Sequence, residues 1–156
     1  MRRKDREVTD RNEIFTILSH CDVLRIGFSG NGEYPYIVPV AFGYKIVDDS
    51  IIIYYHGAKE GLKTDLLRKN PKVCIEADTC NGYVQKDNTF TCEYESIIGF
   101  GDAETVTGDE RFEGLDLIME HCGFNAREYN MKVAEITGVF KVTVHEFTGK
   151  RRVIKK

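Results

Sequence analysis

The sequence predicts a mainly β protein with a few helices, arranged as an antiparallel barrel. Apolar segments of strand length are joined by short turns such as residues 29–32, Ser-Gly-Asn-Gly, which accept positive φ angles. Residues 73–78 alternate apolar and polar side chains, as a half-buried strand does. Because the strands come in series and no G-x-G-x-x-G follows a strand, the pattern favours a barrel over a parallel α/β sheet.

Length and composition predict one globular domain over residues 1–156. The chain has 42% hydrophobic and 30% charged residues, which is ordinary for a folded domain. Its net charge of −3 argues against a general nucleic-acid binder, which normally has a basic excess. The charged N-terminal segment leads into no apolar stretch, and no apolar run approaches the ~20 residues of a membrane helix. We therefore expect a cytoplasmic protein.

The cysteines and histidines predict neither a disulfide framework nor a metal site. Five cysteines make an odd count without C-x-x-C spacing, so reduced thiols are expected. We interpret Cys74, Cys80 and Cys92 as small buried core residues rather than redox groups. Three of the four histidines lack the spacing typical of metal ligands: they are His20, His121 and His145.

The first half of the chain predicts one helix and three strands. Asp10 and Glu13 supply carboxylates at the capping positions of a helix. Strands are then expected at residues 23–28, 36–44 and 51–55, and the short connections between them predict a meander.

The second half predicts two further helices among longer strands. A helix over residues 59–69 ends at Asn70-Pro71, because the residue before proline avoids the α region. A strand at 72–78 and a polar loop at 79–88 precede a long strand at 90–106. Asp109 opens the last predicted helix, and a final strand covers residues 137–147.

The segment after the third strand predicts an anion-binding site. Gly57, Ala58 and Gly61 allow a ligand to approach the backbone closely. Free backbone amides at a helix start, together with Lys63, make a phosphate site. His56 lies at the end of the strand, where its side chain could contact the ring of a bound ligand. A solvated lysine and a structural histidine are the alternatives, and each is commoner in proteins generally.

Two other segments allow more than one interpretation. Pro39 removes a backbone donor in mid-strand, so its strand lies at an edge, is bulged, or faces a ligand. An ordinary edge-strand proline explains it equally well. Gly99 and Gly101 suggest a bend in the long strand, where Ser96 could hydrogen-bond a ligand.

Taken in order, these segments resemble the pyridoxamine 5′-phosphate oxidase-like flavoproteins, and within them the nitroimidazole-resistance branch. The resemblance spans nearly the whole chain. The residues that carry it are Met1-Arg2-Arg3-Lys4-Asp5-Arg6, Pro35-Tyr36-Ile37-Val38-Pro39, Phe42-Gly43-Tyr44, His56-Gly57-Ala58 with Gly61 and Lys63, Asn70-Pro71-Lys72-Val73, Tyr94-x-Ser96-x-x-Gly99-x-Gly101 and Thr148-Gly149-Lys150.

The resemblance implies an antiparallel split β-barrel that binds FMN at the interface of a homodimer. It places the isoalloxazine ring beside the 38–40 backbone, and the phosphate on the 57–63 segment. The chain departs from related oxidases at Leu62, where an arginine is usual. The cofactor-binding residues implied are Val38, Pro39, Val40, Tyr55, His56, Gly57, Ala58, Lys63, Tyr94 and Ser96.

The function implied is that of an FMN-dependent oxidoreductase. It would use NADH or NADPH to reduce a small substrate such as a nitroaromatic, with His56 as the candidate catalytic residue. One alternative is a flavin- or haem-binding module without turnover, since the sequence has no separate nicotinamide motif. A second alternative is a barrel without cofactor that serves protein interaction.

Overall fold

The computed structural model describes residues 2–86 and 88–154. Met1 and Asp87, which fall in the first family motif and in the predicted polar loop, lie outside the described residues. In chain order the elements are η1 (Lys4–Arg6), β1 (Glu7–Val8), α1 (Arg11–Ser19), β2 (Leu24–Phe28), β3 (Tyr36–Val40), β4 (Phe42–Val47), β5 (Ser50–Gly57), α2 (Leu62–Lys69), β6 (Lys72–Lys86), β7 (Thr89–Val106), α3 (Glu110–His121), α4 (Met131–Ile136) and β8 (Gly138–Arg152).

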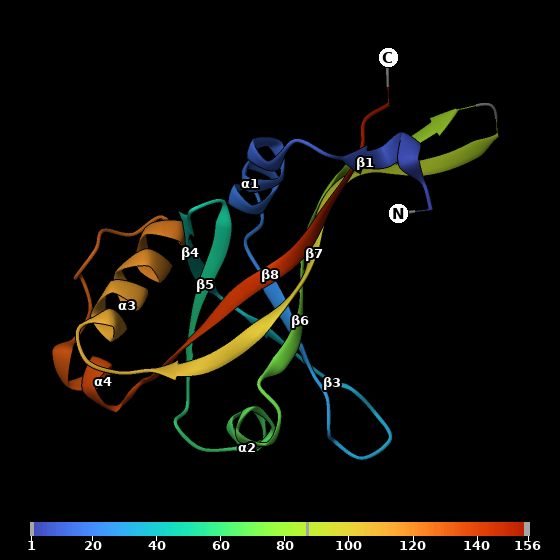
Figure 1. Cartoon of the computed structure of the whole chain (residues 1–156). Coiled ribbons are helices and arrows are strands. Elements are labelled where there is room, and N and C mark those ends of the chain that lie inside the picture. Colours follow the sequence, from blue (N-terminus) through green and yellow to red (C-terminus); the bar gives the residue numbers. More distant parts are fainter. Residues whose placement is uncertain (1, 87, 155–156) are drawn as a thin grey trace.

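The strands form one antiparallel sheet that curls into a barrel without closing. Along the sheet the order is β3-β2-β6-β7-β8-β5-β4, and β1 adds to β8 (Figure 1). The two outer strands of this path, β3 and β4, follow each other in the chain with only Ala41 between them. The predicted split β-barrel is therefore confirmed, and the split lies between two consecutive strands.

The prediction of one strand over residues 36–44 was wrong, because the chain changes partners at Ala41. Before this residue the chain pairs with β2, where Val40 lies opposite Leu24. After it the chain pairs with β5, where Phe42 lies opposite Tyr55. Local sequence pattern cannot show this exchange, since both segments have strand character.

The predicted polar loop at 79–88 is instead a continuation of two strands. β6 and β7 stay paired from Lys72 opposite Asp102 to Lys86 opposite Thr89. This hairpin projects beyond the barrel (Figure 1), and residues 79–85 and 88–92 on it are exposed or only partly buried. Polar residues are therefore tolerated in it, and the alternation of a half-buried strand is absent.

The helices begin and end where local chemistry dictates. Asp10 caps α1, as predicted, accepting hydrogen bonds from the backbone N–H groups of Asn12 at 2.8 Å and Glu13 at 3.3 Å. α2 begins three residues later than predicted, because Gly61 has a φ of 122° and cannot be helical. It ends at Asn70 before Pro71, as expected. The short helix α4 was not predicted.

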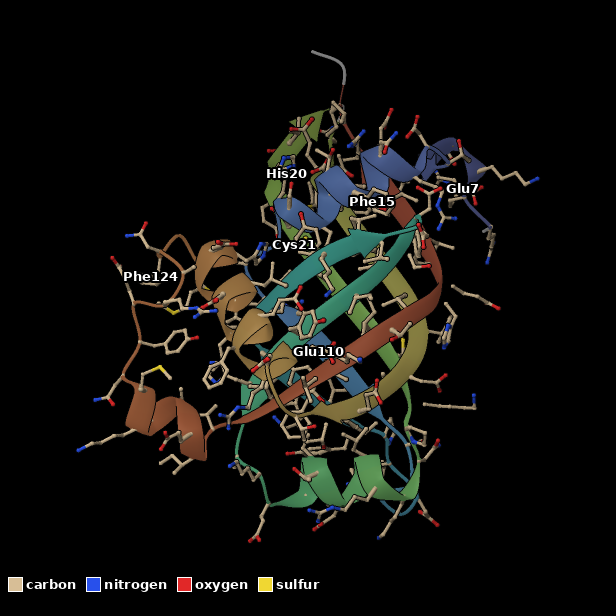
Figure 2. All side chains as sticks on the ribbon, turned by 60° about the vertical axis from the view of Figure 1, so that its left-hand side comes forward. Glu7, Phe15, His20, Cys21, Glu110 and Phe124 are labelled. Carbon is tan, nitrogen blue, oxygen red and sulfur yellow. The ribbon has the colours of Figure 1, made fainter. Side chains whose placement is uncertain are left out.

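The side chains form two cores on opposite faces of β5 and β8. The barrel interior holds Tyr55 and Phe140, among the inward residues of all the long strands. The outer face of the same strands contributes Tyr54 and Val139 to a second core beneath α3 and α4. Figure 2 shows α3, with Glu110 at its start, lying over the strands, where Tyr54 donates a hydrogen bond of 2.9 Å to the Glu110 carboxylate.

The interpretation of three cysteines as buried core residues was wrong for Cys80. Its side chain is exposed, while Cys74 and Cys92 are only partly buried. Cys80 and Cys92 lie on the projecting hairpin, which has no core to enter. Among the described residues, no helix is both long enough and apolar enough to cross a membrane.

Candidate functional site

The predicted anion site is assembled locally, from the end of β5, a short loop and the first turn of α2. Thr64 ties the two ends together, because its hydroxyl donates to the carbonyl of Ala58 at 3.4 Å. The N-cap of α2 is Gly61, and no side chain caps the helix. The first N–H groups of α2 are thus left for another acceptor.

Lys63 projects from α2 back over the end of β5. Its Nζ lies 4.9 Å from the centre of the Tyr55 ring and 5.2 Å from that of Phe140. A Cβ atom on Gly57 would fall 2.4 Å from this Nζ, so only glycine leaves the ammonium its place. The site is a cradle of two aromatic rings and one glycine around a cation.

No carboxylate balances the charge of Lys63 among the residues that the structure describes. The side chain is half-buried, and this burial lowers the pKa of its ammonium. Lys45 and Lys141, by contrast, pair with Glu113 and Glu110 at 2.7 and 3.0 Å. A partly desolvated cation without a counter-ion favours binding of an external anion.

Tyr55 supplies a second unsatisfied polar group beside Lys63. The residue is fully buried and stacks on Phe140, with ring centres 5.1 Å apart and an interplanar angle of 15°. Its hydroxyl has no hydrogen-bond partner within the described parts of the chain, and burial raises the pKa of this phenol. Buried polar groups are nearly always hydrogen-bonded, so this hydroxyl is available to a water molecule or to a polar atom of a ligand.

His56, the candidate catalytic residue, lies on the opposite face of β5 from Tyr55. Its side chain is exposed, and partial desolvation and the nearby charge of Lys63 lower its pKa, so the ring is neutral at pH 7. With residues of α3 and α4 it borders an apolar cavity of about 240 Å³. Leu115, Ile118 and Val133 form apolar walls of this cavity.

A basic cavity of about 360 Å³ adjoins the Lys63 cradle. Thr64 and Phe140 line it together with three cations, Lys59, Arg68 and Arg111. Lys59 and Arg111 both donate to the carbonyl of Glu135, at 2.8 and 3.2 Å. Thr137 lines this cavity and also the apolar one, so the two are neighbours at the end of β5.

Sequence reasoning missed Phe140, Arg68 and Arg111. The alternation within residues 137–147 marks Phe140 as an inward residue, but not as the partner of Tyr55. The two arginines carry no local signal, because surface arginines are common and only the packing of α2 and α3 brings them to one cavity.

The predicted ring-binding strand is an edge strand, which confirms one of the interpretations of Pro39. Pro39 lies opposite Arg25 of β2, and the other edge of β3 has no strand partner in the described sheet. Val40 comes two residues before Phe42, which pairs with Tyr55. The end of β3 therefore lies near the end of β5 in the same chain.

Tyr94 and Ser96 do not join the other predicted site residues. Ser96 pairs with Lys150 on β8, whereas His56 pairs with Val139 near the opposite end of that strand. From 139 to 150 the strand runs roughly 36 Å at about 3.3 Å per residue. A single chain therefore does not bring Ser96 to the cradle around Lys63.

A comparison with protein families matches residues 10–151 to the pyridoxamine 5′-phosphate oxidase model. This stretch contains the cradle, both cavities and all the predicted site residues. The chain belongs to the pyridoxamine 5′-phosphate oxidase family. A search among curated proteins gave no match.

Solved structures of other members of this fold agree with the assignment. A proposed 5-nitroimidazole antibiotic resistance protein of Bacteroides thetaiotaomicron is 29% identical, with a TM-score of 0.80 over 92% of this chain and 85% of that one. A flavocytochrome of Azotobacter vinelandii is 21% identical, with a TM-score of 0.78 over 99% and 72%. An FAD and haem binding protein of Mycobacterium smegmatis is 16% identical, with a TM-score of 0.73 over 94% and 73%.

Proposed function

We propose that this member of the pyridoxamine 5′-phosphate oxidase family binds FMN and acts as an oxidoreductase on a small substrate. The observation that carries the proposal is the half-buried ammonium of Lys63, held by Tyr55, Phe140 and Gly57 without a counter-ion in the described chain. A phosphate monoester supplies the missing negative charge.

The residues around this ammonium suit a phosphate. The start of α2, which no side chain caps, offers backbone N–H donors beside it, and Gly57 and Ala58 are the residues of the preceding segment proposed to face the phosphate. Lys59, Arg68 and Arg111 add positive charge in the adjoining cavity. The unpaired hydroxyl of Tyr55 is available to a polar atom of the same ligand. The phosphate end of the nucleotide is therefore assigned to this corner.

The ring end of the flavin is assigned to β3 and His56. Within the described sheet, β3 with Val38, Pro39 and Val40 has a strand partner on one edge only, which leaves its other edge free for a ligand. His56 is neutral at pH 7, so its two ring nitrogens offer one donor and one acceptor. When bound, the flavin supplies hydride and electron transfer, while the protein holds and orients it.

A homodimer would complete each site. Tyr94 and Ser96 are displaced from the cradle by most of the length of β8, so a second copy is needed to bring them there. The outer face of the sheet carries exposed apolar side chains, Ile37 and Phe100, around a cavity of about 730 Å³. Such a face is typical of a protein–protein contact.

The proposed substrate is a small aromatic molecule such as a nitroaromatic, reduced at the expense of NADH or NADPH. The apolar cavity of about 240 Å³ bordered by His56 supports this class. The resemblance of the fold to a proposed nitroimidazole resistance protein points in the same direction.

A second candidate function is a flavin- or haem-binding module without turnover. It is favoured by the similarity of the fold to a flavocytochrome and to an FAD and haem binding protein. The visible spectrum separates the candidates, because flavin and haem absorb differently. Reduction of bound flavin by NADH or NADPH, followed by substrate-dependent reoxidation, separates an enzyme from a module.

The decisive experiment measures flavin binding to the wild type and to Lys63→Met, which keeps the aliphatic stem. The wild type should retain about one flavin per chain after gel filtration. Loss of charge-assisted contacts in Lys63→Met should weaken binding by about 10- to 100-fold. Lys69→Met is the matched control, because Lys69 is an exposed lysine on the same helix. Equal flavin affinity in both variants would remove Lys63 from the site.

A further inference from the structure

The hairpin that projects from the barrel brings two thiols into contact. Cys80 lies on β6 and Cys92 on β7, and their Sγ atoms are 2.9 Å apart. Both are free thiols; Cys80 is exposed and Cys92 is partly buried. The pair is thus accessible to small molecules and lies outside the site described above.

The register of the hairpin explains the contact. Cys80 lies opposite Tyr94, and Cys92 is two residues from Tyr94 on the same strand, so both thiols share one face of the hairpin. A bulge after Cys80 shifts the register, and Gly82 accepts a φ of 128° there. Beyond the bulge Tyr83 lies opposite Cys92.

We propose that Cys80 and Cys92 form a redox-active dithiol, which a low-molecular-weight disulfide converts reversibly to a disulfide within the chain. The sulfur atoms need to approach by only about 0.9 Å to reach the disulfide length of about 2.05 Å. Cys21 is buried, and Cys74 and Cys122 have no thiol partner among the described residues, so this pair stands apart from the other three thiols.

The surroundings give the two thiols different tasks. The contact with Cys92 and the backbone N–H of Gly82 lower the pKa of Cys80, against the opposing charge of Asp78. The same contact raises the pKa of Cys92, where Glu93 acts in the same direction and Arg152 against it. Cys80 is exposed whereas Cys92 is partly buried, so Cys80 is the attacking thiolate and Cys92 the resolving thiol.

The reaction balances as two exchanges. The Cys80 thiolate attacks one sulfur of the small disulfide, forming a mixed disulfide and releasing one small thiolate. Cys92 then loses its proton and attacks the Cys80 sulfur, forming the Cys80–Cys92 bond and releasing the second small thiolate. The protein gives up two electrons and two protons, and one small disulfide is reduced to two thiols.

The new bond would fix the projecting hairpin. It joins the two strands at the bulge and encloses the tip, which carries the exposed side chains of Tyr83 and Phe90. Closing this loop restricts the opening of the hairpin tip. The aromatic tip is then presented in one geometry in the oxidised protein.

The test uses the reduced full-length chain incubated with oxidised glutathione, alkylated with iodoacetamide and mapped by mass spectrometry. The expected product is a Cys80–Cys92 cross-linked peptide that dithiothreitol reverses, with Cys122 left alkylated. In Cys92→Ser, glutathione should remain attached to Cys80. In Cys80→Ser, the remaining Cys92 should react several-fold more slowly than Cys80 does in the wild type.

Cys122→Ser is the control, because this exposed thiol lies far from the hairpin in sequence and should not affect the cross-link. Glutathione attached separately to Cys80 and Cys92 without a cross-link would overturn the proposal. A cross-link between two chains, seen as a dimer on a non-reducing gel, would overturn it equally.

Discussion

At the scale of single residues, Gly57 decides where the charge of Lys63 lies. A Cβ atom at this position would meet the flexible end of Lys63 at 2.4 Å, and no backbone atom lies close. Gly57→Ala should therefore displace the ammonium and leave the fold intact. We expect weaker FMN binding by isothermal titration calorimetry, with an unfolding midpoint in urea within the error of the wild type.

Two results with the same variant would contradict this prediction. If Gly57→Ala binds FMN as tightly as the wild type, the position of the ammonium over Tyr55 and Phe140 has no part in binding. If Gly57→Ala lost stability to unfolding together with FMN affinity, Gly57 would be required for the fold rather than for the position of the ammonium.

The protonation of His56 reports the charge of Lys63. Desolvation and then Lys63 hold the pKa of His56 below its ordinary value. Lys63→Met should raise this pKa towards that value, while Lys69→Met should leave it unchanged. The measurement is a pH titration of the His56 ring signals by NMR. An unchanged His56 pKa in Lys63→Met would mean that desolvation alone causes the shift.

The sign of the effect on stability follows from the same pKa. Because the folded pKa lies below the unfolded value of about 6.5, the unfolded chain binds the proton more tightly. His56 therefore lowers stability as the pH falls through the unfolded value and then the folded value. Removing the Lys63 charge should reduce this loss, measured as urea unfolding at pH 7 and pH 5.

Turnover gives a separate prediction for His56. His56→Ala should lower the rate of substrate reduction while FMN stays bound, because the proposed phosphate site is formed by Lys63 and the neighbouring basic cavity and not by His56. Steady-state kinetics on flavin-loaded protein measures the effect. Unchanged turnover would show that His56 neither orients the ring nor moves a proton.

At the scale of elements, β4 and α3 approach each other closely at Gly43. A Cβ atom on Gly43 would fall 2.3 Å from the backbone carbonyl carbon of Leu117, and neither backbone can yield cheaply. Gly43→Ala should destabilise the fold by about 2–4 kcal/mol in urea unfolding. Gly27→Ala is the control on another strand, because its nearest neighbours lie at an ordinary 3.6 Å. If Gly43→Ala and Gly27→Ala reduced the free energy of unfolding equally, α3 would be able to move away from β4 without an energetic cost.

Elements also show where sequence pattern is sufficient. Asp10 predicts the start of α1 because capping acts over three residues. Pro71 predicts the end of α2 for the same local reason. Pattern fails over residues 79–88, where the strands continue into solvent without an apolar face. It also fails at α4, whose six residues show one buried side chain, Ala134.

At the scale of the whole molecule, the proposed sharing of each site between two chains makes a prediction that no single variant can test. Lys63→Met and Ser96→Ala should each weaken FMN binding alone. In mixed dimers one of the two sites has both residues intact. Random mixing should therefore restore about a quarter of the binding sites. Flavin content after unfolding and refolding the mixture together measures this.

Two outcomes would contradict the shared site. One is a monomeric mass by light scattering with flavin fully bound. The other is a mixture that binds no more flavin than the two variants kept apart, because Lys63 and Ser96 would then not come from different chains.

The sequence by itself determined the strand-rich class, the N-cap of α1 and the end of α2, and it singled out the segment from His56 to Lys63 that carries the proposed site. These features depend on residues within one turn of each other, or on alternation along one strand. Only the tertiary structure decided that the chain changes sheet partners at Ala41, that Phe140 lies under Lys63, and that Cys80 meets Cys92. Each of these depends on which strands pair and in what register, and that choice is made by burying the whole set of inward side chains together rather than by any one segment.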